Sequence, residues 1–113
     1  MIRSRRKTVL KLAKGVIMKK PKTEISLARA MIMTEFALTE LTVGLEFANI
    51  ARESHLMNRY AEGLRQKAQA VRAHQSALNY LPEADPTEEQ QTLIEKRLDE
   101  LVSALNTLDK IYP

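Results

Sequence analysis

The sequence predicts an all-α fold: a three-helix, antiparallel up-down bundle with a basic N-terminal amphipathic segment that can add a fourth helix. Its composition suits helices, because two Phe, three Tyr and no Trp in 113 residues are too few aromatic residues to favour a sheet. Apolar residues recur every three or four positions over long stretches, which is the helical spacing. Prolines divide these stretches at Pro21 and between Pro82 and Pro86. A chain of this length forms one domain.

Charge divides the chain into a basic arm, residues 1–22, and a helical bundle domain, residues 23–113. The arm holds nine of the eighteen Lys and Arg residues and no acid, whereas the bundle holds the other nine against all fourteen Asp and Glu. Such an arm is a candidate for binding nucleic acid or another anion. Its basic residues are Arg3, Arg5, Arg6, Lys7, Lys11, Lys14, Lys19, Lys20 and Lys22.

Four interpretations of the arm stay open. Its apolar residues lie close to one helical face with lysines around them, so it can be an arm that neutralises phosphates or a helix on an anionic membrane surface. A basic, acid-free amphipathic segment is also typical of targeting sequences. The fourth interpretation is a tail that charge keeps in solution. The apolar residues are Val9, Leu10, Leu12, Ala13, Val16 and Ile17.

The first helix of the bundle is expected from Glu24 to Glu53, after Thr23 as a fair N-cap. It has two apolar seams, which is typical of a helix with neighbours on two sides. Thr34 interrupts the first seam. That seam comprises Leu27, Met31, Leu38, Leu41, Leu45 and Ala48. The second seam, which we expect to be an interface, comprises Met33, Phe36, Val43, Phe47 and Ile50.

The boundary after this helix is weak, because the stretch from Arg52 to Asn58 contains no Gly or Pro. Either the chain turns near Ser54 and His55, or one helix continues for nearly sixty residues. A helix that long would extend about 85 Å, so we favour the turn. The second helix is then expected from Leu56 to Tyr80.

The second and third helices carry opposite charge. On the second, Arg65 and Arg72 lie seven residues apart and form a basic row that can contact phosphates or face the acidic third helix. The third is expected to begin with Asp85 as N-cap and Pro86 as its first residue and to end at Ile111. Its apolar residues form one stripe, so it is expected to pack on one side only. They are Ile94, Leu98, Leu101, Leu105, Leu108 and Tyr112.

No catalytic, metal or cofactor site is expected. The chain has no Cys, and neither His55 nor His74 follows a Glu by three residues, as a di-iron carboxylate site requires. No glycine-rich phosphate loop is present. Absence of Cys is compatible with a reducing compartment, and we expect a cytoplasmic location without a transmembrane segment.

Three functions are compatible with the sequence. The first is a non-enzymatic helical interaction or assembly module that self-associates, or binds another helical protein, through the apolar first helix. The second is a nucleic-acid-associated protein that uses residues 1–22 and the basic row Arg65 and Arg72. The third, a carboxylate-metal or hydrolytic enzyme, is the weakest, because no motif supports it.

Overall fold

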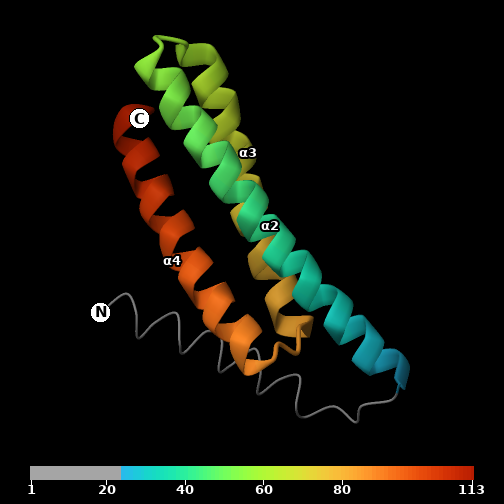
Figure 1. Ribbon diagram of the computed structural model, residues 1–113. Helices are drawn as coiled ribbons and strands as arrows, with labels where there is room; N and C mark the ends of the chain where they lie inside the picture. Colours follow the sequence, from blue (N-terminus) through green and yellow to red (C-terminus); the bar gives the residue numbers. More distant parts are fainter. Residues whose placement is uncertain (1–23) are drawn as a thin grey trace.

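The computed structural model describes residues 24–113, which form three α-helices and no strand. They are α2 (Glu24–Leu56), α3 (Tyr60–Tyr80) and α4 (Glu88–Ile111), with a short 3-10 helix, η1 (Leu81–Glu83), after α3. Figure 1 shows α2 as the longest helix, with α3 and α4 alongside it. The predicted all-α class is therefore confirmed. The predicted basic arm, residues 1–22, lies outside the described residues.

Small residues line the buried side of α2. Ala37, Ala48 and Ala51 are buried there, and Gly44 is buried between both neighbouring helices. A Cβ added at Gly44 would stand 2.9 Å from Leu101 Cδ2 of α4 and 3.2 Å from the Ala73 Cβ of α3. Small side chains at these positions let the helices approach closely, and interiors are packed too densely to leave room for more.

The predicted first seam of this helix is wrong at its start, because Leu27 and Met31 are exposed. The residue that interrupts the seam, Thr34, is instead buried. Its hydroxyl donates to the Ala30 carbonyl (2.9 Å) and accepts from the Asp85 backbone N–H (3.0 Å). Two hydrogen bonds satisfy this buried hydroxyl, and the second ties the start of α2 to the loop before α4.

The chain turns at Met57–Arg59, not near Ser54 and His55, so the second helix begins at Tyr60 and not at Leu56. Asn58 has φ 59°, in the left-handed region. Asn tolerates this conformation better than other non-glycine residues, and a left-handed residue commonly ends a helix. The signal for this turn is therefore Asn58, in a stretch where neither Gly nor Pro marks a boundary.

The N-cap of α4 is Thr87, so the prediction of Asp85 as cap is wrong. Thr87 Oγ1 accepts from the Gln90 backbone N–H, and the Gln90 side chain accepts from the Thr87 backbone N–H. This reciprocal pair is a capping box, which satisfies two donors at the helix start. Gln90 at the third helical position supplies it, and Glu88 is the first helical residue.

The end of α4 is held by Tyr112, which is fully buried. Its hydroxyl donates to the Ala51 carbonyl at 2.6 Å, and its ring lies against Tyr60 and His55. The predicted stripe of α4 is confirmed, and Leu105 is its least buried member. Buried members are Ile94, Leu98, Leu101, Leu108 and Tyr112.

Candidate interaction site

An apolar column runs along α2 on the side turned away from α4. Three residues at seven-residue intervals, Glu35, Thr42 and Asn49, face α4. Glu35 accepts a hydrogen bond from Gln90 (3.2 Å), Thr42 accepts one from Arg97, and Asn49 lines a groove with α4. The residue after each of them lies about 100° further around the helix. These residues, together with Ile32 four positions before Phe36, form a row that we call the outer column. Its members are Ile32, Phe36, Val43 and Ile50.

Large apolar side chains of the outer column remain open to solvent. Ile32 is 48% exposed, Phe36 46% and Ile50 40%, and Val43 is half-buried. A lone exposed apolar residue is ordinary, but a row of them on one helix side marks a surface that can be covered by a partner. This column is the strongest candidate site within residues 24–113.

The predicted interface residues divide between this column and the edge of the core. Phe36 and Ile50 are exposed, whereas Met33, Val43 and Phe47 are half-buried, and Phe47 packs against the core. The Phe36 ring lies 5.4 Å from the Tyr80 ring of α3. The prediction did not include Ile32, although its position four residues before Phe36 places it on the same side of the helix.

The basic row of α3 lies on the same face of the α2–α3 pair. Lys67 marks the side of α3 that faces α4, since its ammonium lies 3.0 Å from Asp109 Oδ1 and donates to the Tyr112 carbonyl (2.7 Å). Arg65 precedes it by two residues, about 200° around the helix. Arg65 and Arg72 are both exposed and therefore point away from α4. The other predicted anion-binding residues, from Arg3 to Lys22, lie outside the described part of the chain.

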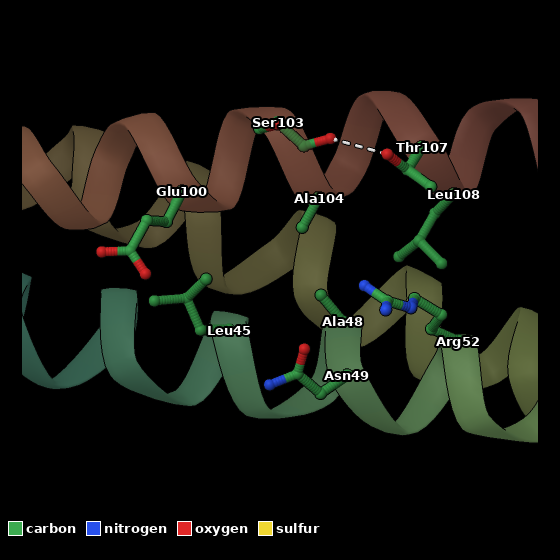
Figure 2. A pocket seen from close by; sticks show the side chains of 9 residues that line it. All are labelled: Leu45, Ala48, Asn49, Arg52, Glu100, Ser103, Ala104, Thr107 and Leu108. Atoms are coloured by element: carbon green, nitrogen blue, oxygen red, sulfur yellow. Dashed lines mark hydrogen bonds between the residues drawn. The ribbon is translucent and has the colours of Figure 1, made fainter.

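A second feature is an open groove of about 440 Å³ between α2 and α4. Figure 2 shows the Arg52 and Glu100 side chains toward opposite ends of it, with Asn49 between them. The Thr107 hydroxyl donates to the Ser103 carbonyl on the α4 wall. The lining contains no His or Cys and a single carboxylate, so it offers no pair of groups suited to proton transfer or metal binding. The full lining is Leu45, Ala48, Asn49, Arg52, Glu100, Ser103, Ala104, Thr107 and Leu108.

The two histidines occupy different surroundings. His55 is exposed beside the Tyr112 ring, 6.1 Å between ring centres. His74 is half-buried on α3, and burial lowers the pKa of its imidazole. Within residues 24–113, no three His, Asp or Glu side chains gather to hold a metal ion. In the same range, no helix combines the length and apolar character needed to cross a membrane.

The comparisons with known proteins leave the surface geometry as the guide to function. No protein-family model, no curated protein and no solved structure matches the chain.

Proposed function

We propose that this chain is a non-enzymatic helical interaction or assembly module that self-associates through the outer column of α2. The observation that carries the proposal is the exposure of Ile32, Phe36 and Ile50 on one side of a helix whose other sides pack against α3 and α4. Covering this apolar surface with a second copy would remove it from water, and burial of apolar area is the main favourable term in protein association. The closed symmetry typical of homo-oligomers uses the same patch on both copies.

We also infer an antiparallel, up-down order for the helices, in keeping with this role. The start of α4 is tied to Thr34 of α2 through Asp85, and its end is tied to Ala51 through Tyr112. At the C-terminal end of α3, the ring of Tyr80 contacts the ring of Phe36 of α2. These contacts support a bundle in which α2 presents its outer column between Ile32 and Ile50. A fourth helix from residues 1–22 would complete the bundle.

Crosslinking tests whether the outer column is the self-associating surface. The natural chain has no Cys, so a single introduced thiol reports one position. Thr39→Cys and Glu46→Cys are exposed and lie four residues before and three residues after Val43, beside the column. We expect both variants to form covalent dimers with a short thiol crosslinker. Thr92→Cys, exposed on α4, is the matched control and should stay monomeric. Equal crosslinking at all three positions would show random collision and contradict the proposal.

A second candidate function is association with nucleic acid, which the exposed pair Arg65 and Arg72 supports together with the basic arm. We expect binding to DNA or RNA to weaken steeply with salt, because each neutralised phosphate releases counterions. Arg65→Gln/Arg72→Gln should reduce the salt slope on duplex DNA by roughly 0.9 for each phosphate that the variant no longer neutralises. Removal of residues 1–22 without any change in affinity would exclude the arm from this role.

A further inference from the structure

The side of the bundle opposite the outer column contains a second open surface, where α3 and α4 face each other. α2 contributes to the core with both helices, whereas α3 and α4 make polar and ring contacts with each other near the end of α4. There Lys67 reaches Asp109, and Tyr60 lies 5.3 Å from Tyr112 between ring centres. Because α3 and α4 both pack on α2, the three helices occupy three corners of a four-helix arrangement. Away from these contacts, the fourth corner is left for another element.

The α3 side of this surface is apolar. Tyr60, Lys67 and His74 are seven residues apart, and the first two contact α4, so this row faces α4. Four residues after each of them stand Leu64, Val71 and Leu78, on nearly the same side of the helix. Leu64 is 42% exposed, Leu78 39%, and Val71 is half-buried.

The α4 side of this surface is acidic. Glu88, Glu95, Val102 and Asp109 also lie seven residues apart, and Asp109 is the residue that pairs with Lys67 of α3. The row therefore faces α3. Its first two members, Glu88 and Glu95, are carboxylates, and Val102 follows them in the sequence. Asp99, four residues after Glu95, adds a third acid to the same flank. On the α3 wall, Lys67 is paired with Asp109, and burial lowers the pKa of His74. We call this surface the α3–α4 corner: Leu64, Val71, Leu78, Glu88, Glu95, Asp99 and Val102.

We propose that the basic N-terminal segment of the same chain, residues 7–17, docks as a helix in the α3–α4 corner. Charge favours this occupant, since the segment brings Lys7, Lys11 and Lys14 to an acidic wall. Its apolar residues, from Val9 to Ile17, match an apolar α3 wall.

The length and attachment of the segment fit as well. Residues 7–17 would span about 16 Å as a helix, which fits within the roughly 36 Å of the 24-residue α4. The segment joins α2 at Glu24, near the end of the bundle where Arg29 pairs with Glu83 at 3.1 Å. It therefore enters the corner beside Leu78 and Glu88 and runs toward Leu64. This surface is separate from the outer column, so the inference does not depend on self-association.

Paramagnetic relaxation in the full chain tests the docking. A spin label at Gln75→Cys would sit beside Val71 and Leu78, whereas a label at Glu46→Cys would sit on the opposite side of the bundle. We expect the backbone amide signals of residues 7–17 to vanish with the Gln75 label and to remain with the Glu46 label. Equal signals with the two labels would overturn the proposal.

A mixed sample separates an intramolecular occupant from a second copy. Isotope-labelled natural chain is combined with spin-labelled Gln75→Cys chain of natural isotope content. Retained signals for residues 7–17 support docking within one chain, whereas loss of signal in this sample would show that the segment occupies another copy and would overturn the proposal.

The charge argument has its own matched pair of variants. Glu88→Gln/Glu95→Gln/Asp99→Asn should restore the signals of residues 7–17 in the presence of the Gln75 label, because the acidic wall is removed. Glu46→Gln/Glu53→Gln, which removes acids from the opposite side of α2, should leave the signals absent. If both sets behave alike, charge does not hold the segment and this part of the proposal is wrong.

Discussion

Replacement of Gly63 by Ala is expected to lower the free energy of unfolding by about 2 kcal/mol or more, the range of overpacking in a tight interior. Gly63 is buried in the first turn of α3, directly against Tyr112. An added Cβ would stand 2.5 Å from Tyr112 Cζ and closer still to its hydroxyl oxygen. The gain of about 1 kcal/mol in helix propensity from Gly to Ala is smaller than this cost.

The Tyr112 side chain cannot move aside cheaply. Its hydroxyl donates to the Ala51 carbonyl, and its ring lies between Tyr60 and His55. Displacing it would break the hydrogen bond of the buried Tyr112 hydroxyl, at a cost of about 1–3 kcal/mol. Gly63 is therefore required for the space it leaves, since its backbone does not adopt positive φ.

Urea unfolding followed by circular dichroism measures this effect, with Gly44→Ala as the matched control. At Gly44 the closest atom, Leu101 Cδ2, is the end of a side chain, so a smaller decrease in stability is expected. The penalty of Gly63→Ala should also shrink in a Tyr112→Leu background, because the obstructing ring is gone. An equal penalty with and without Tyr112 would contradict the proposed cause.

Ile32→Glu/Ile50→Glu is expected to abolish self-association while the helical content is retained. Both side chains are exposed in the single chain, so a charge there disturbs the fold little. In the associated form, each Glu would be buried without a partner, which disfavours binding strongly. We expect the dissociation constant to rise about 100-fold or more, since each factor of ten corresponds to about 1.4 kcal/mol.

The control for this variant is Leu56→Glu/Met57→Glu, which introduces the same two charges at the exposed end of α2 and in the turn after it, outside the outer column. It should leave the dissociation constant unchanged. Size-exclusion chromatography with light scattering compares the three chains at matched concentrations. Equal effects of the two double variants would indicate a general response to added negative charge and would exclude the outer column as the interface.

Much of the helical layout could be predicted from the sequence, because apolar spacing reports helices directly. The α4 stripe is the clearest case, since Ile94, Leu98 and Leu101 repeat at helical intervals and are buried as expected. The buried side of α2 was harder to predict. Its contacts depend on Ala37, Gly44 and other small residues, whose burial follows from close helix approach and not from high hydrophobicity.

The remaining errors concern the end of α2 and the start of α4, where a single residue decides the helix boundary. Asn58 ends α2 by adopting a left-handed conformation, which Asn accepts without being a strong breaker. Thr87 caps α4 because Gln90 completes the capping box. In the sequence, Asp85 followed by Pro86 is an equally plausible helix start. Both alternatives were chemically sound, so only the geometry could choose between them.

The candidate surfaces could be predicted only in part. The sequence placed Phe36, Val43 and Ile50 in one row, but it could not tell which row α3 and α4 would cover. The α3–α4 corner was not predicted, because it depends on how two helices are rotated about their axes when both pack on α2. The exposure of Leu64 and Leu78 follows from that rotation and from no local sequence pattern.

The most direct test of self-association is sedimentation velocity of the unmodified chain over a series of protein concentrations. We expect the sedimentation coefficient to rise with concentration from the value of a 12.9 kDa monomer toward that of a dimer. A single monomeric species up to high micromolar concentration would contradict the proposal that the outer column binds a second copy.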